Sequence, residues 1–140
     1  AVPLPELLEE LGARVKEDCE ANGIKFSLST KRLTVRAKRS ALFSVLFNLV
    51  FNAIEHAECT EISVRAEKSG ERVFLKVTDN GKGLSDNARI FEPYFTGNES
   101  DDNSGLGLFI VKSETEAMGG TIAYSGKNGS TFTLSLLSEF

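Results

Sequence analysis

Two asparagines, Asn48 and Asn52, stand four residues apart in a mostly apolar stretch, residues 40–57, in a polar stripe with Ser44, Glu55 and His56. The length and composition of this stretch predict a helix that is buried on most sides, with Ser40 as its N-terminal cap. Residues four apart share one face of a helix, so the two amides are expected to lie side by side. A buried amide needs hydrogen-bonding partners. The pair therefore either caps neighbouring loops or faces a ligand, and amide oxygens suit Mg²⁺ beside a phosphate chain.

Asp79 comes directly after a predicted strand and is followed by Gly81 and Gly83. Asn-Gly sequences are typical of hairpin turns, but no alternating strand follows this one. The glycines are therefore interpreted as allowing the backbone to pass close to a ligand. Asp79, at the end of a strand, is interpreted as an acceptor for an exocyclic amine.

Two further glycine segments lie nearer the C-terminus. Gly105 and Gly107 open a predicted helix, whose N-terminal N–H groups can face an anion. Residues 129–132, Gly-Ser-Thr-Phe, make a turn that leads into the last predicted strand. Taken alone, each segment also has a purely structural interpretation, because glycines often begin helices and turns.

The elements that must position these residues follow from the hydrophobic pattern. Helices are predicted at residues 6–21, 40–57 and 106–118, and strands at 24–29, 33–37, 61–68, 72–78, 121–124 and 131–137. The short turn at residues 30–32 predicts a hairpin of 24–29 with 33–37, and residues 69–70 predict a second hairpin. Helices and hairpins in this order predict an α+β fold, with one mixed or antiparallel sheet carrying helices on one face.

The chain has 140 residues and a formal net charge of −4, and 41% of its residues are hydrophobic. These values predict a single globular domain over residues 1–140. The acidic excess disfavours nucleic acid as a partner, and no apolar run reaches the roughly 18–20 residues of a membrane span. Cys19 and Cys59 are far apart and the chain has one histidine, so we expect free thiols in a reducing compartment rather than a zinc site.

The chain ends and one charged stretch add two expectations. Residues 25–39 contain basic but no acidic residues, which predicts a solvated face or, second, a docking surface for a partner. The sequence does not begin with Met, which favours a piece cut from a longer protein.

Taken in order, the motifs resemble those of the ATP-binding catalytic domain of sensor histidine kinases, in the GHKL or Bergerat-fold superfamily. Residues 48–53 resemble the N box, 79–83 the first glycine box, 90–95 the F box, 105–108 the second glycine box and 129–132 the final one. The resemblance covers nearly the whole chain. It implies a two-layer α/β sandwich, in which a mixed sheet of about five strands carries three helices on one face.

The resemblance implies Mg-ATP as the ligand. Asn52 would coordinate Mg²⁺ between the phosphates, Asn48 would lie near the same phosphates, and Asp79 would bind the adenine amino group. Asn48 and Asn52 are thus the expected catalytic pair, and residues 85–104 the expected lid. The ATP-binding residues that the resemblance implies are Asn48, Asn52, His56, Asp79, Gly81, Gly83, Leu84, Gly105, Leu106, Gly107, Leu108 and Thr131.

In the gyrase, chaperone and mismatch-repair branch of the superfamily, a water-activating glutamate stands at the position of Asn48. Because Asn48 has no carboxylate, slow hydrolysis is expected, with the γ-phosphoryl group held for another nucleophile. The resemblance implies a histidine on a separate dimerisation domain of the same parent protein, with a response regulator downstream. His56 is not expected to be this acceptor, so the chain alone should not phosphorylate itself. A cytoplasmic domain without direct membrane contact is implied, whether or not the parent is membrane-anchored.

Two other interpretations stay open. A degenerate, non-catalytic nucleotide-binding or scaffold module would explain the acidic residues on or beside the expected lid, which are Glu92, Glu99, Asp101 and Asp102. A serine- or threonine-phosphorylating relative of the anti-sigma type would normally carry a carboxylate in place of Asn48. Acidic residues near a polyphosphate raise the free energy of its binding. The sequence therefore predicts weak ATP binding, in the high micromolar range or above.

Overall fold

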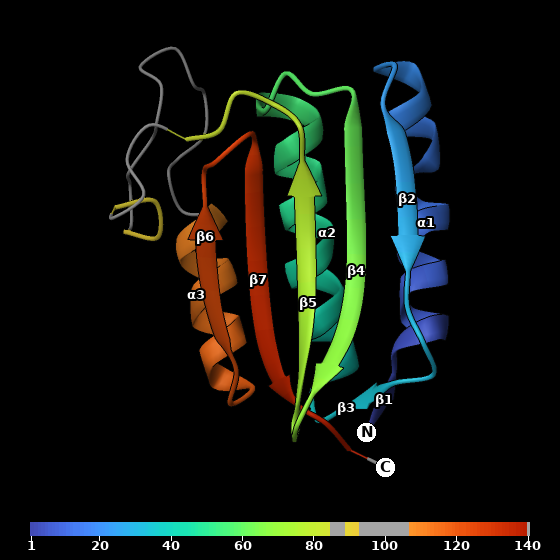
Figure 1. Ribbon diagram of the computed structural model, residues 1–140, viewed down its shortest axis with the longest axis vertical. Coiled ribbons are helices and arrows are strands. Elements are labelled where there is room, and N and C mark those ends of the chain that lie inside the picture. Colours follow the sequence, from blue (N-terminus) through green and yellow to red (C-terminus); the bar gives the residue numbers. More distant parts are fainter. Residues whose placement is uncertain (85–88, 93–106, 140) are drawn as a thin grey trace.

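In the computed structural model, which describes residues 1–84, 89–92 and 107–139, five strands form one mixed sheet in the order β2-β4-β5-β7-β6 (Figure 1). They are β2 (Lys25–Ser29), β4 (Glu61–Ser69), β5 (Arg72–Asp79), β6 (Thr121–Ser125) and β7 (Ser130–Leu137). β2 runs parallel to β4, and the other pairs are antiparallel. Buried and more exposed residues alternate along β4 and β5, because successive side chains of a strand point to opposite faces. The sheet thus has a core face and a solvent face.

Three helices cover the core face of this sheet: α1 (Leu4–Ala21), α2 (Arg39–His56) and α3 (Gly107–Ala117). Figure 1 shows all three behind the strands, with α1 behind β2 and α3 behind β6. The hydrophobic core lies between the two layers and includes Leu11, Leu46, Val64, Leu75 and Leu134. This arrangement confirms the predicted α+β sandwich of one mixed sheet with helices on one face.

The predicted hairpin of residues 24–29 with 33–37 is wrong. β3 (Thr34–Val35) pairs with β1 (Val2–Pro3) in a separate two-stranded sheet, while β2 joins the main sheet beside β4. Leu28 and Phe26 of β2 pack against Gly12 of α1, so this position lets them contact the helix layer. The physical reason is long-range packing, which outweighs the local turn signal at residues 30–32. The predicted hairpin of β4 with β5 is confirmed, and β6 pairs with β7 in the same antiparallel way.

α2 differs from the prediction in its cap and in its burial. The helix begins at Arg39 after Lys38, and no side chain caps it, so the assignment of Ser40 as the cap is wrong. Six of its residues are buried, which are Leu42, Val45, Leu46, Leu49, Val50 and Ala53. Its phenylalanines are only partly buried: Phe43, Phe47 and Phe51 stack along the helix with ring centres 6.3 and 5.6 Å apart. α2 therefore buries one face rather than most of its surface.

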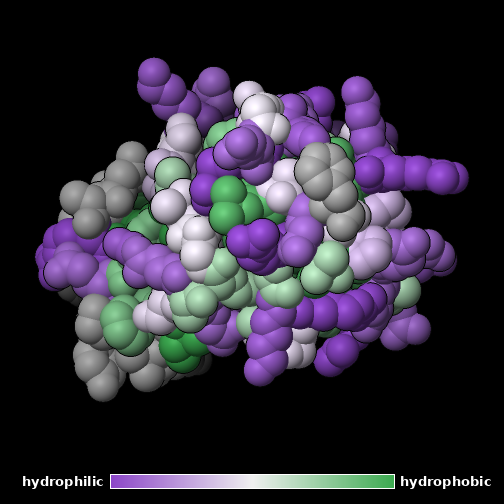
Figure 2. All heavy atoms as spheres, turned by 90° about the horizontal axis from the view of Figure 1, so that it is seen from below, coloured by the Kyte–Doolittle hydropathy of each residue, from purple (hydrophilic) through white to green (hydrophobic). Residues whose placement is uncertain are grey.

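The chain ends meet at the lower end of the sheet in Figure 1. The backbone N–H of Glu139 donates to Thr34, and the N–H of Arg36 donates to Leu137. Figure 2, seen from this end, shows mainly hydrophilic residues with small hydrophobic patches between them. Two arginines of the basic stretch form ion pairs here, Arg39 with Glu10 at 2.8 Å and Arg36 with Glu139 at 3.6 Å. These contacts fit the solvated face predicted for residues 25–39.

None of the helices in the described part of the chain is long and apolar enough to cross a membrane.

Candidate functional site

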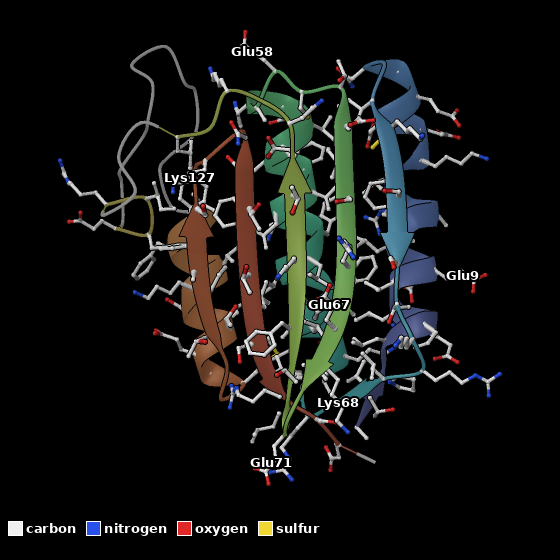
Figure 3. All side chains as sticks on the ribbon, in the orientation of Figure 1. Glu9, Glu58, Glu67, Lys68, Glu71 and Lys127 are labelled. Atoms are coloured by element: carbon white, nitrogen blue, oxygen red, sulfur yellow. The ribbon has the colours of Figure 1, made fainter. Side chains whose placement is uncertain are left out.

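The candidate site lies at the upper end of the sheet, where β5 ends, β7 begins and α2 ends (Figure 1). Asp79 is the last residue of β5, and it pairs directly with Ser130, the first residue of β7. In Figure 3, Glu58, just beyond α2, marks this end, and Glu71 marks the opposite end of the sheet. Residues that are distant in sequence thus meet at one end of the sheet.

Asp79 is a buried carboxylate, with only 6% of its surface exposed. Its Oδ1 accepts a hydrogen bond of 2.8 Å from the N–H of Gly81, and the backbone N–H of Ser130 also donates to the carboxylate. Burial raises the pKa of Asp79 above its ordinary value, and the two backbone hydrogen bonds oppose that rise. Asp79 is therefore a fixed acceptor in a poorly solvated place, which suits recognition of an amino group.

Two glycines near Asp79 are required by close backbone contacts within the chain. A Cβ atom at Gly81 would lie 2.0 Å from the carbonyl oxygen of Ala57, just beyond α2. A Cβ atom at Gly129 would lie 2.1 Å from the carbonyl oxygen of Asp79, and Gly129 has a φ of +103°. The neighbouring backbone thus requires glycine at position 81 by itself, and the interpretation that Gly81 lets the backbone pass close to a ligand stays a prediction. Gly83 also has a positive φ, +73°.

Asn80 joins the end of β5 to the connection between α2 and β4. Its Oδ1 accepts hydrogen bonds from the N–H groups of Thr60 (2.9 Å) and Glu61 (3.0 Å), and its Nδ2 donates to Oγ1 of Thr60. Cys59 lies within this connection; it is buried and has a free thiol, and so does Cys19. The pKa of Cys59 is raised, mainly by burial and to a smaller extent by the nearby charge of Asp79. The sequence analysis did not identify Asn80, whose role follows from contacts twenty residues away.

Asn48 and Asn52 lie one turn apart on the same face of α2. Phe47, the residue before Asn48, faces α1, because the guanidinium of Arg14 on α1 lies 5.2 Å from its ring centre. Asn48 is therefore about 100° around the helix from the residue that contacts α1. Both asparagines are partly exposed rather than buried, so their amides can reach a ligand.

His56 is the last residue of α2 and lies on the same side as Asn52, one turn further on. It is partly exposed, and its Nε2 lies 3.5 Å from Oε2 of Glu55. Glu55 itself is exposed. The last turn of α2 thus brings the Asn52 amide and the His56 imidazole toward the same end of the sheet as Asp79.

Part of the predicted glycine and lid segments lies outside the described residues. These are Gly105, Leu106, residues 85–88 and residues 93–104. Gly107 is the first residue of α3, and a Cβ atom there would meet nothing within 4 Å, while Leu108 packs against the core. Glu92 forms an ion pair with Arg89 at 2.9 Å. That pairing partly neutralises one of the acidic residues that the weak-binding prediction invokes.

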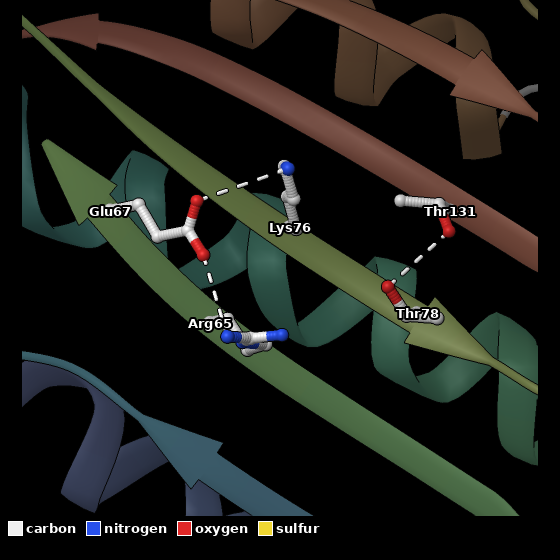
Figure 4. A network of polar contacts seen from close by, with 5 residues as sticks. All are labelled: Arg65, Glu67, Lys76, Thr78 and Thr131. Carbon is white, nitrogen blue, oxygen red and sulfur yellow. Dashed lines mark hydrogen bonds and ion pairs between the residues drawn. The ribbon is translucent and has the colours of Figure 1, made fainter. Parts of the chain in front are cut away.

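Thr131 is not brought together with the Asp79 carboxylate. Its hydroxyl lies 3.3 Å from that of Thr78, and Figure 4 shows both on the solvent face, with the helices behind the strands. Glu67 bridges Arg65 and Lys76 on the same face (Figure 4). The expected place of the Thr131 side chain near the adenine pocket is therefore corrected, because neighbouring residues of a strand point to opposite faces.

Ser130 and Tyr124 occupy the place predicted for Thr131. Ser130 is 5% exposed, and its hydroxyl lies 2.9 Å from that of Tyr124 on β6. The Tyr124 hydroxyl also accepts a hydrogen bond of 2.7 Å from the N–H of Leu84. The sequence analysis missed both residues. The apolar Phe132, which must face the core, was the signal that Ser130 shares the core face.

Known proteins resemble this chain over nearly its whole length. Residues 37–139 match the family described as histidine kinase-, DNA gyrase B- and HSP90-like ATPases. The sensor histidine kinase ZraS of Escherichia coli strain K12 is 37% identical over 141 residues, which cover 96% of this chain and 30% of ZraS. The alginate biosynthesis sensor protein KinB of Pseudomonas aeruginosa is 31% identical over 131 residues, which cover 90% of this chain and 22% of KinB.

Solved structures agree with these relatives. The catalytic domain of the histidine kinase ThkA superposes with a TM-score of 0.86 at 30% identity, covering 97% of this chain and 95% of that one. Full-length ShkA, solved in complex with AMPPNP, superposes with a TM-score of 0.86 at 27% identity, covering 99% of this chain and 31% of ShkA.

A one-sided sandwich with a buried aspartate at a strand end and an asparagine-bearing helix beside it defines an ATP-binding domain. The chain belongs to the histidine kinase-, DNA gyrase B- and HSP90-like ATPase family, as an ATP-binding catalytic domain of the sensor histidine kinase type. It spans less than a third of the length of the curated relatives ZraS and KinB.

Proposed function

We propose that this chain binds Mg-ATP and holds the γ-phosphoryl group for transfer to a histidine on a dimerisation domain of the same parent protein. In this proposal residues 1–140 are the catalytic unit of a cytoplasmic two-component kinase core, with a response regulator as the later acceptor. The observation that carries it is the buried Asp79 carboxylate at the end of β5, in a chain that matches histidine kinases. The AMPPNP complex of ShkA supports a nucleotide site in the shared fold.

The donor set fits a nucleotide and a magnesium ion. Asp79 offers a carboxylate acceptor in a place that excludes most water, which favours a charge-assisted hydrogen bond from an exocyclic amine. Among the described residues, no cluster of three or more histidine, cysteine or acidic side chains could hold a metal. In this proposal Mg²⁺ would be held by the amide oxygen of Asn52 together with phosphate oxygens. When bound, ATP supplies the phosphoryl group and Mg²⁺ neutralises charge on the phosphates.

The residues divide between two ends of the site. Asp79, Gly81, Gly83, Leu84 and Ser130 would hold the base end, and Ser130 replaces Thr131 in this set. The residues proposed for the phosphate end are Asn48, Asn52, His56, Gly105, Leu106, Gly107 and Leu108. Helix α3 begins at Gly107, so its N-terminal N–H groups would add donors at the phosphate end.

The residue at position 48 decides which nucleophile is used. An asparagine cannot take a proton from water, so Asn48 can orient a phosphate oxygen but cannot act as a general base. The chain would therefore contribute positioning and charge stabilisation. The histidine nitrogen of the partner domain would attack the γ-phosphorus atom, and the bond from that atom to the β–γ bridging oxygen would break to release ADP. His56 would act on the phosphate side rather than as the acceptor.

The test combines the chain with Mg-ATP and a separately produced histidine-bearing dimerisation domain of the parent. Acid-labile phosphate on that domain is the expected result, with none on the chain alone. Asn52→Asp should lower the transfer, because a carboxylate at that position adds charge beside the phosphates. Binding of ATP without transfer to any parent-derived acceptor would contradict the proposal and favour a scaffold module.

A further inference from the structure

Tyr124 links three separate segments around the base end of the proposed site. It lies on β6, and its hydroxyl accepts a 2.7 Å hydrogen bond from the N–H of Leu84. The same hydroxyl lies 2.9 Å from Oγ of Ser130, in a hydrogen bond for which either oxygen can be the donor. Its ring packs against Phe132 with the ring centres 4.9 Å apart. One side chain therefore contacts the glycine segment after β5 and the start of β7.

Glycines with positive φ angles lie beside both of the residues that the Tyr124 hydroxyl contacts, Leu84 and Ser130. Gly83 and Gly129 both adopt positive φ angles, and they lie close together, since a Cβ atom at Gly83 would be 3.2 Å from the carbonyl oxygen of Gly129. Glycine has the widest backbone freedom of any residue, so such segments need outside contacts to keep one conformation. Asp79 fixes Gly81 by one hydrogen bond, and Tyr124 fixes Leu84 by another.

We propose that Tyr124 is a positioning residue for nucleotide binding, because its hydroxyl holds the Gly83–Leu84 backbone and the Ser130 hydroxyl in place around Asp79. The ring of Tyr124 needs no contact with the nucleotide for this role. The inference rests on the proposed function, because it assigns Tyr124 to the base end of the same site. It predicts that loss of the hydroxyl weakens nucleotide binding through the base and not through the phosphates.

The main variant is Tyr124→Phe, which removes the hydroxyl and keeps the ring beside Phe132. Leaving the Leu84 N–H and the Ser130 hydroxyl without this partner should weaken ATP binding about tenfold, measured by calorimetry with Mg²⁺ present. ADP should lose affinity by the same factor, because the two nucleotides share the base. A loss confined to ATP would overturn the assignment to the base end.

The matched control is Thr78→Val, which removes a hydrogen-bonded hydroxyl on the solvent face of β5, one residue from Asp79. It should lower the melting temperature without a tenfold loss of ATP affinity. If both variants weaken ATP binding in proportion to their melting temperatures, Tyr124 acts only on stability and the inference is overturned. If the wild-type chain does not bind Mg-ATP, the proposed function fails first; if it binds and Tyr124→Phe binds equally well, only this inference fails.

A second variant keeps the test informative even if Tyr124→Phe folds poorly. Ser130→Ala removes the hydroxyl that bonds to Tyr124 and should also weaken ATP binding. Where both single variants fold, the double variant should lose less affinity than the sum of the two single losses. Additive losses, or ATP binding by Ser130→Ala equal to that of the wild type, would overturn the inference.

Discussion

Replacing Asp79 by asparagine should abolish most nucleotide affinity while leaving the fold intact. The change keeps the size of the side chain but removes the charge and turns one acceptor oxygen into a donor. In the structure the Asp79 carboxylate already accepts from the N–H groups of Gly81 and Ser130. An asparagine amide oriented to keep those contacts would point its NH₂ group at the incoming amino group. The NH₂ group of the asparagine would then face the amino group of the base, and that amino group would lose its acceptor.

The size of the effect follows from the type of hydrogen bond lost. A hydrogen bond to a charged acceptor contributes about 1.5–3 kcal/mol, and each 1.4 kcal/mol corresponds to about a factor of ten in the dissociation constant. Asp79→Asn should therefore weaken ATP binding roughly 10- to 150-fold in calorimetry at neutral pH. Affinity for inorganic tripolyphosphate, which has no base, should not change. Equal binding of ATP by the variant and the wild type would refute the role of Asp79 in base recognition.

The raised pKa of Asp79 adds a pH dependence with opposite signs for binding and for stability. Protonation removes the charged acceptor, so ATP affinity of the wild type should fall as the pH drops through the raised pKa. A carboxyl whose pKa is higher in the folded state binds its proton more tightly there, so its contribution to the free energy of unfolding falls as pH rises from the ordinary aspartate pKa through the raised one. Asp79→Asn should remove both dependences, as urea unfolding and calorimetry across that pH range would test.

Three further predictions concern stability and affinity. Gly81→Ala should lower the free energy of unfolding by about 3 kcal/mol, because its methyl group would overlap the Ala57 carbonyl oxygen in a well-packed contact. Asn80→Ala should lower it by about 0.5–1.5 kcal/mol in urea unfolding, because the exposed N–H groups of residues 60–61 exchange their acceptor for water. The acidic residues at 92–102 should hold the dissociation constant of Mg-ATP in the high micromolar range or above; a sub-micromolar constant by calorimetry would contradict this.

Matched variants separate these effects from a general loss of stability. Gly107→Ala places a methyl group where no atom lies within 4 Å and should not destabilise the chain. Asn22→Ala removes a single hydrogen bond to the exposed carbonyl of Asp18 and should cost less than Asn80→Ala. If the control variants cost as much as their counterparts, the contacts assigned to Gly81 and Asn80 are not what stabilises these positions.

Local patterns in the sequence were enough to predict the element types and much of the site. The periodicity of α1, α2 and α3 and the apolar strands β4 to β7 predicted a one-sided α+β sandwich, and the structure confirms it. Asn48, Asn52 and Asp79 stood out because polar residues at those places need a partner. These signals depend on residues that are near one another in sequence, so they can be interpreted without the fold.

Other features depended on contacts between distant segments. The local turn at residues 30–32 predicted a hairpin, but β2 is placed by its packing on α1 and its pairing with β4. The close contact of Gly81 with the Ala57 carbonyl, which requires glycine there, was not predicted either. Neither the partner of a strand nor the neighbour of a glycine is encoded in the adjacent residues, so local patterns could not supply them.

The sequence by itself determined the class of this protein, because the order of its motifs and the alternation of its apolar residues are local properties that survive without coordinates. The tertiary structure alone decided which side chains meet at the end of β5. A shift of one residue along a strand moves a side chain to the other face of the sheet, which is why Ser130 and not Thr131 lies beside Asp79. Tyr124 lies at the site because β6 pairs with β7, which brings its hydroxyl to Ser130.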